Sequence, residues 1–148
     1  MPPAPAPHAL ATERLIAASP SQVFAAFARP ELLARWWGPA GFTNTFSHFD
    51  FTPGGRWVFV MHAPDGADFA NESVFREIVP DTRLVIEHVV APWFRLTVTL
   101  DAHEKGTRLS WVQEFESPEF AARMRAFVTS ANEQVLDRLA ALPFDQSA

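Results

Sequence analysis

The feature that most constrains the fold is an unbroken series of short alternating segments between residues 43 and 115. Apolar residues recur at every second position, as Trp57, Phe59 and Met61 do, which predicts strands with one apolar face. Turn signals such as Asp65-Gly66 separate the segments. Because consecutive strands joined by tight turns pair antiparallel, the series predicts an antiparallel meander.

We expect the strands of this meander at residues 46–51, 56–62, 68–79, 83–90, 93–100 and 107–115, preceded by a short strand at 12–18. In the first of them, strict alternation places Phe49 and Phe51 on the inner face. The same alternation places Phe46 on the opposite face, with His48 and Asp50.

Helix signals lie on both sides of the meander. The stretch SPSQ at 19–22 indicates a helix start with a capping box. Pro30 opens a second short helix, which Gly38-Pro39 ends, and Ser117-Pro118 begins a long helix with an apolar stripe to about Leu142. A strongly twisted sheet curls around the one element that is long enough to cover it. We therefore predict an α+β helix-grip fold: a curved seven-stranded antiparallel sheet around a long C-terminal helix, with two short helices between strands one and two.

The chain length of 148 residues fits one domain, which we place at residues 12–142. Four prolines among the first seven residues favour an extended, disordered lead-in over residues 1–11. Residues 143–148 are expected to form a C-terminal tail.

Composition excludes several classes of protein. The chain has no cysteine, which excludes disulfides and a thiol nucleophile and fits a cytoplasmic location. A formal net charge of −5 without a basic cluster argues against nucleic acid as a partner. No apolar run approaches the roughly 20 residues that span a bilayer.

We expect no metal and no other cofactor. Gly54-Gly55 lacks the lysine and the Ser/Thr of a phosphate loop. His48, Asp50 and His62 lie opposite the apolar positions, and a solvated face explains them better than a metal site does.

Large rings are frequent, with 14 Phe and five Trp. One helix cannot fill the concave face of a curved sheet so rich in rings, so we expect a hollow inside. Ligand cavities are typically apolar with a few polar groups and have volumes of roughly 300–1,000 Å³. His88 and Gln113 fall in phase with inward residues and are the expected polar groups. The expected wall consists of Trp36, Trp37, Phe42, Phe49, Phe51, Trp57, Phe59, Met61, Phe75, His88, Phe94, Trp111, Gln113, Met124, Phe127, Val128 and Ala131.

The stretch WWGP at 36–39 ends the second short helix with two adjacent indoles. Adjacent residues on a helix point in different directions, so Trp36 and Trp37 cannot share one packed seam. We expect one indole in the core and the other at the cavity mouth, continued by Phe42. The alternative is that both are core residues of an irregular corner.

These features resemble the helix-grip fold of START-type lipid-binding domains and of the birch-pollen-allergen superfamily. Within that superfamily the chain resembles the domain named after the activator of the Hsp90 ATPase. The resemblance rests on SPSQVFAAFARPELLARWWGP (19–39), FDFTPGGRWVFVM (49–61), PDG (64–66), REIVPDTRLVIEH (76–88) and GTRLSW (106–111). The last helix of that family usually carries a Gly-Trp pair where this chain has Ala131 and Asn132, which implies a wider cavity with an added polar group.

The leading hypothesis is that the protein binds a small hydrophobic or amphipathic molecule and has no catalytic residue. The alternative is an enzyme of the polyketide cyclase or aromatase kind, for which His88, Glu72 and Glu87 are the acid–base candidates. That alternative fails if Glu72 points outward and a backbone group holds His88. A third hypothesis is a co-chaperone-like domain that acts through its surface. A homodimer is a further possible assembly, with Trp93 beside Pro92 as its candidate contact. The alternative is that Trp93 is merely an edge residue.

Overall fold

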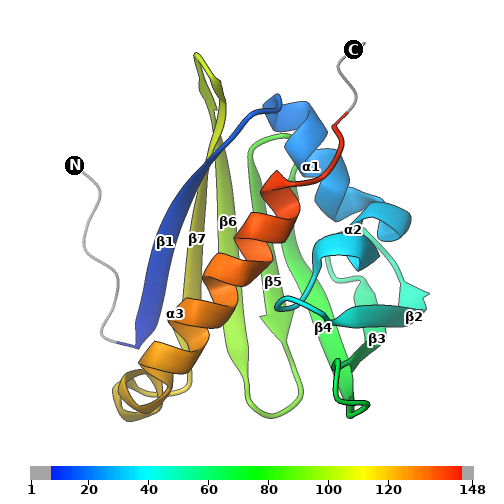
Figure 1. Ribbon diagram of the computed structural model, residues 1–148, viewed down its shortest axis with the longest axis vertical. Helices are drawn as coiled ribbons and strands as arrows, with labels where there is room; N and C mark the ends of the chain where they lie inside the picture. The colour runs from blue at the N-terminus through cyan, green and yellow to red at the C-terminus, as the bar shows by residue number, and fades with distance from the viewer. Residues whose placement is uncertain (1–7, 145–148) are drawn as a thin grey trace.

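The computed structural model describes residues 8–144 and shows a seven-stranded antiparallel sheet packed against three helices (Figure 1). The elements in chain order are β1 (Ala9–Ile16), α1 (Pro20–Ala28), α2 (Pro30–Trp36), β2 (Thr43–Phe49), β3 (Arg56–His62), β4 (Asp68–Val79), β5 (Arg83–His88), β6 (Phe94–His103), β7 (Gly106–Phe115) and α3 (Pro118–Ala140). The strand order is β1-β7-β6-β5-β4-β3-β2, so β1 closes the meander beside β7. In Figure 1, α3 runs diagonally across β1, β7 and β6, and α1 and α2 lie beside it. The predicted α+β helix-grip architecture is confirmed.

The element boundaries depart from the prediction in a few places. β1 begins at Ala9 and pairs with β7, so the expected disordered lead-in is wrong for residues 9–11. The long helix ends at Ala140 rather than Leu142. Residues 1–7 and 145–148 lie outside the described residues, so the predictions for them stay predictions.

The helix starts follow the capping signals. Ser19 Oγ accepts from the Gln22 backbone N–H at 3.2 Å, and Gln22 Oε1 accepts from the Ser19 N–H at 2.9 Å, which completes the capping box of α1. Ser117 Oγ accepts from the Phe120 N–H at 3.1 Å at the start of α3. These caps satisfy backbone donors that the helix itself leaves unpaired.

A β-bulge in β2 corrects the predicted alternation. The register with β3 shifts between Phe46 and His48, so one extra residue separates Phe46 from Phe49. Both rings therefore lie on the inner face, with centroids 5.8 Å apart. The prediction that Phe46 faces outward is wrong, because alternation cannot reveal an inserted residue.

Rings fill the part of the inner face that α1 and α2 cover. We call this set the aromatic cluster: Phe24, Phe27, Trp36, Phe46, Phe49, Phe51, Trp57 and Phe75. Trp57 is completely buried, and its ring centroid lies 5.3 Å from that of Phe46 and 6.0 Å from that of Phe75. Phe51 links the sheet to α1 through Phe24, with centroids 5.7 Å apart. Such pairs add about 0.5–1.5 kcal/mol each beyond the burial of their area.

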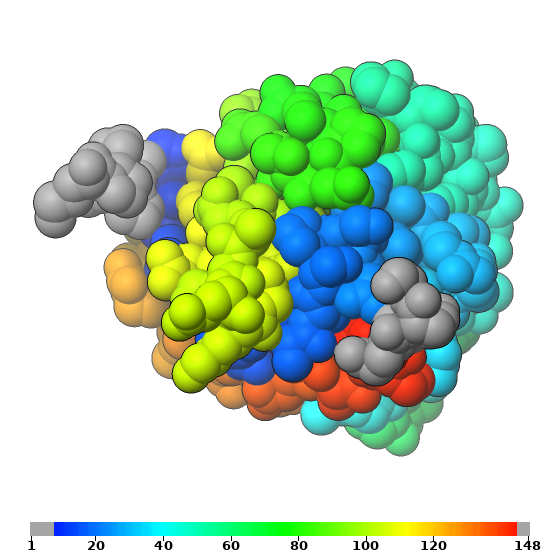
Figure 2. Space-filling model, turned by 90° about the horizontal axis from the view of Figure 1, so that it is seen from above, coloured from blue at the N-terminus to red at the C-terminus, as the bar shows by residue number. Residues whose placement is uncertain are grey.

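A second, smaller core lies under the first half of α3. It consists of Leu10, Phe115, Ala121 and Val128, with Met124 and Phe120 packed against them. In the view of Figure 2, α1 lies between the β4–β5 turn, the β6–β7 turn and the C-terminal part of α3. A hollow remains under α3, between the two cores.

Candidate ligand-binding cavity

A cavity of about 380 Å³ lies between the sheet, the segment 37–42 and α3. Its volume falls within the range of small-molecule sites, roughly 300–1,000 Å³. It is lined by Trp37, Gly38, Pro39, Phe42, Phe59, Met61, Phe69, Asn71, His88, Pro92, Phe94, Leu96, Trp111, Gln113, Phe127, Ala131, Asn132 and Val135. Most of these side chains are apolar, so the site suits an apolar molecule.

The two adjacent tryptophans have different roles. Trp36 is fully buried, and its Nε1–H donates to the Ala26 carbonyl at 3.0 Å. Trp37 lines the cavity, and its ring centroid lies 5.0 Å from that of Trp57 and 6.1 Å from that of Trp111. Trp37 thus forms the boundary between the aromatic cluster and the hollow. It is a buried wall residue, not the residue at the mouth that we expected. Both indoles belong to one buried cluster, with ring centroids 5.6 Å apart, as the alternative had it.

One guanidinium holds the segment that carries Trp37. Arg138 Nη1 donates to the carbonyls of Gly38 at 2.8 Å and Pro39 at 2.9 Å. Its Nη2 donates to the carbonyls of Arg35 at 2.9 Å and Phe42 at 3.0 Å. Burial lowers the pKa of Arg138, but such a group stays charged at any ordinary pH. The side chain therefore attaches the whole segment to the last turns of α3.

Two further contacts fix the same segment. Gln134 Oε1 accepts from the Ala40 N–H at 3.0 Å, and Asn44 Nδ2 donates to the Trp37 carbonyl at 2.8 Å. Gly38 has φ of +100°, which favours glycine, and a Cβ there would come within 2.8 Å of Met61 Cε. The glycine lets the backbone follow the cavity wall closely.

One polar group in the wall is an amide pair. Asn132 Nδ2 donates to Gln113 Oε1 at 3.0 Å. Asn132 lies on α3 and Gln113 on β7, so the pair joins the helix to the sheet across the cavity. The resemblance implied a polar group at position 132, and the structure places Asn132 in the wall.

The second polar group is centred on His88, which is buried at the end of β5. Its Nδ1 lies 2.8 Å from the Pro92 carbonyl oxygen and its Nε2 lies 2.7 Å from Asn71 Oδ1. The ring stacks on Phe94, with centroids 4.6 Å apart and planes inclined by 11°. Burial lowers the pKa of His88, against the opposing effect of backbone hydrogen bonds at Pro92 and Val90.

Exposed rings lie along one side of the cavity. Phe69 is 51% exposed and Phe127 is 68% exposed, although both line the hollow. Phe42 lies next to Phe69, with ring centroids 6.4 Å apart. These rings place the opening between β4 and α3, and they give it an apolar rim.

The structure brings part of the predicted wall together. The predicted residues that line the cavity are Trp37, Phe42, Phe59, Met61, His88, Phe94, Trp111, Gln113, Phe127 and Ala131. Trp36, Phe49, Phe51, Trp57 and Phe75 instead belong to the aromatic cluster, where α1 and α2 cover them. Met124 and Val128 pack in the small core under the first half of α3.

Sequence reasoning did not assign several of the lining residues to the wall. They are Gly38, Pro39, Phe69, Asn71, Pro92, Leu96 and Val135. Asn71 and Phe69 of β4 pair with Phe59 and Met61 of β3 and lie on the same inner face. Residues that pair across a hairpin share a face, so the alternation of β3 predicts the inward residues of β4 as well.

The other acid–base candidates lie outside the cavity. Glu72 Oε2 accepts from Arg56 Nε at 3.0 Å, and Glu87 accepts from Arg76 Nε and Trp93 Nε1, each at 2.7 Å. Both carboxylates are on the outer face of the sheet. With His88 held by the Pro92 carbonyl, both conditions against the cyclase hypothesis are met. The same contacts hold Trp93 against the sheet, and the homodimer stays a prediction.

No metal site is visible within residues 8–144, where no group of three or more His, Asp or Glu side chains is arranged to hold an ion. His62 lies on the outer face, where Asp68 Oδ1 and Thr45 Oγ1 are 2.7 and 2.8 Å from its ring nitrogens. Asp50 instead receives a hydrogen bond from Thr52 Oγ1 at 2.9 Å.

Comparison with known families gives a match over residues 17–143 to the family described as activator of Hsp90 ATPase homolog 1-like protein. The chain belongs to this family. The predicted resemblance is therefore confirmed over nearly the whole described chain. No curated protein matches the sequence.

Solved structures share the fold of this family member. A crystal structure of a Chromobacterium violaceum protein is 28% identical, with a TM-score of 0.82 over 90% of this chain and 95% of that one. A solution structure from Arthrobacter aurescens is 25% identical, with a TM-score of 0.83 over 90% and 84% of the two chains. An AHSA1-like protein from Aeromonas hydrophila is 22% identical, with a TM-score of 0.77 over 95% and 97%, and shows likeness of fold alone.

Within the described residues, none of the helices has both the length and the apolar character needed to cross a bilayer.

Proposed function

We propose that the protein binds a small hydrophobic or amphipathic molecule in its internal cavity. The observation that carries the proposal is a hollow of about 380 Å³ with aromatic walls and two polar groups. Empty apolar space forfeits dispersion contacts with neighbouring atoms, and a fitting ligand restores them.

Two features of the wall support reversible binding. The rim of Phe69 and Phe127 gives an apolar molecule a route from solvent to the interior. The wall from Trp37 to Phe42 is held to α3 by Arg138, so the site has a defined shape before any ligand arrives.

The test is a search for bound molecules followed by a binding screen. Native mass spectrometry of freshly purified protein is expected to show retained mass. A thermal-shift screen of lipids, aromatic compounds and polyketide-like compounds should stabilise the protein by about 2.7 kcal/mol at a ligand concentration of 100 Kd. No retained mass and no stabilisation by any compound would contradict the proposal.

A surface role in the manner of an Hsp90 activator is the contrasting proposal, because the family description carries that name. An internal cavity has no part in such a role. An ATPase-stimulation assay with Hsp90 is expected to show no effect, and clear stimulation would favour the surface role.

A further inference from the structure

The chemistry of the ligand follows from the surroundings of His88, given the proposed function. Within residues 8–144, His88 is the one ionisable side chain among those that line the cavity. All other polar side chains in the wall are amides or indoles. The protonation state of His88 therefore decides whether the cavity is neutral or carries a positive charge.

Both ring nitrogens of His88 face oxygen atoms. Pro92 O lies 2.8 Å from Nδ1, and Asn71 Oδ1 lies 2.7 Å from Nε2. A neutral imidazole has one N–H, so one of these contacts would set a nitrogen lone pair against an oxygen. An imidazolium donates at both positions and satisfies both oxygens.

Rotation of the Asn71 amide does not remove the conflict. Asn71 Nδ2 donates to the Phe69 carbonyl at 2.8 Å. If the amide turned over to offer its N–H groups to His88, its oxygen would lie against the Phe69 carbonyl oxygen. The network is complete only when His88 carries two protons.

Within residues 8–144, no carboxylate faces the cavity as a counter-ion for that charge. The neighbours of His88 on β4 and β6 are Asn71, Ser73 and Phe94, and α3 adds only Phe127, Ala131, Asn132 and Val135 to the cavity wall. The carboxylates of Glu72 and Glu87 lie on the outer face, paired with Arg56 and Arg76. A buried charge without a partner is costly, and burial accordingly lowers the pKa of His88.

We propose that the cavity takes an apolar molecule that bears one anionic group, a carboxylate in the simplest case, and that His88 is an imidazolium when this molecule is bound. The ligand then provides the counter-ion that the wall lacks. The Phe94 ring stacks on the His88 imidazole, and the face of an aromatic ring attracts a positive charge. No carboxylate in the described wall repels the anion.

Linkage gives the expected pH dependence. The bound anion raises the pKa of His88, so the affinity for the anion rises as the pH falls through the pKa of the complex. The gain approaches about tenfold for each pH unit, because one proton is taken up with each ligand. An ordinary carboxylate stays ionised above about pH 5, which leaves a window from about pH 8 down to about pH 5.5.

The experiment compares acids with their methyl esters by calorimetry across this window. The probes are decanoate and 2-naphthoate, each beside its ester. The acids are expected to bind about tenfold or more tightly than the esters at the low end, with an affinity that rises as the pH falls, while the esters show no slope. Equal, pH-independent binding of acid and ester would overturn the charge assignment and leave the proposed function standing. Binding of neither would overturn both.

A variant and a spectroscopic measurement distinguish an effect of the His88 charge on binding from an effect of the substitution on folding. His88→Gln should lose the pH slope for the acid. The control His48→Gln, at an exposed position on the outer face, should keep that slope and bind the ester as the native protein does. In the native protein, NMR of the His88 imidazole should show two N–H groups in the acid complex and one in the ester complex. A neutral ring in the acid complex would contradict the proposal even if His88→Gln did not fold.

Discussion

The two halves of the inner face differ in what covers them. Under α1 and α2, the helices bring their own rings, Phe24, Phe27 and Trp36, to meet those of the sheet. Under the middle of α3, the helix offers Ala131, Asn132 and the exposed Phe127, and a hollow remains. The sheet is rich in rings in both halves. The covering helix, and not the sheet, therefore decides which half is filled.

The two halves are also held together by different interactions. The aromatic cluster is joined by ring contacts such as Phe51–Phe75, with centroids 4.9 Å apart. The hollow half is held by polar contacts at its edges, chiefly those of Arg138 with the segment 35–42 and of Glu133 with β1. Four changes test this contrast, in order of decreasing effect on stability.

The largest effect is expected for Phe75→Ala in the aromatic cluster. Removal of a buried ring from a packed region should lower the free energy of unfolding by about 3–5 kcal/mol. The matched change in the cavity wall, Phe94→Ala, should cost only about 1–2 kcal/mol, because part of that ring already faces empty space. Urea unfolding measures both, and equal losses would mean that the two halves are packed alike.

Arg138→Lys tests the polar attachment of the wall. A lysine lacks the planar fork that reaches four or more carbonyls, so we expect a loss of about 1.5–3 kcal/mol and faster amide exchange at Ala40–Phe42. Arg125→Lys, at an exposed position on the same helix, should change stability by less than about 0.5 kcal/mol. Unaltered exchange in the segment would show that Arg138 does not hold it.

Ala131→Leu tests whether the cavity is empty space that a larger side chain can fill. Added methyl groups should enter the cavity and stabilise the fold by up to about 1 kcal/mol, while ligand affinity falls about tenfold or more. Ala126→Leu, on the exposed side of α3, should leave binding unchanged. Undiminished binding by the Ala131 variant, measured with methyl 2-naphthoate, would place the ligand elsewhere.

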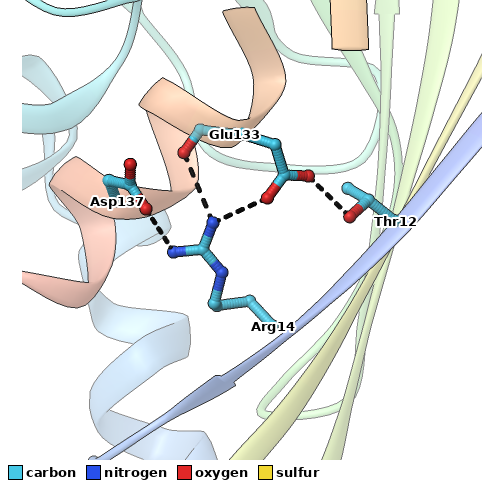
Figure 3. A network of polar contacts seen from close by, with 4 residues as sticks. All are labelled: Thr12, Arg14, Glu133 and Asp137. Atoms are coloured by element: carbon cyan, nitrogen blue, oxygen red, sulfur yellow. Dashed lines mark hydrogen bonds and ion pairs between the residues drawn. The ribbon is translucent and has the colours of Figure 1, made fainter. Parts of the chain in front are cut away.

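Glu133→Gln tests the contact between α3 and β1 shown in Figure 3. Hydrogen bonds from Thr12 Oγ1 at 2.7 Å and Arg14 Nη2 at 2.8 Å lower the pKa of Glu133. The carboxylate is partly exposed, so we expect a loss below about 1 kcal/mol at neutral pH.

The sign of the pH effect follows from the lowered pKa of Glu133. The stabilisation is present above the unfolded pKa of about 4.3 and disappears as the pH falls through the folded value. Unfolding curves of the native protein and Glu133→Gln should therefore converge in acid. A difference that persists there would point to packing instead of charge.

Much of the fold could be predicted because local signals agreed with one another. The alternating rings of β3, the capping box at Ser19 and the stripe of α3 each specify one element. The bulge near Ser47 could not be predicted, since an inserted residue leaves no mark on composition. The prediction starts the first strand at residue 12 instead of Ala9, because the prolines before it suggest disorder.

The site was less predictable than the fold, because the cavity depends on which helix covers each ring. The alternation of β3 alone places both Trp57 and Phe59 in the predicted cavity wall, although only Phe59 lines the cavity. The contacts of Arg138 depend on carbonyls about a hundred residues away, and no local pattern brings these together.

The attachment of residues 35–42 to Arg138 and Gln134 has a mechanical consequence. Because Asn44 of β2 also donates to the Trp37 carbonyl, this wall is bonded to the sheet as well as to α3. A movement of α3 away from the sheet would break hydrogen bonds of this wall or separate Trp37 from Trp57 and Trp111. The cavity is therefore expected to keep its volume and to select ligands by their size.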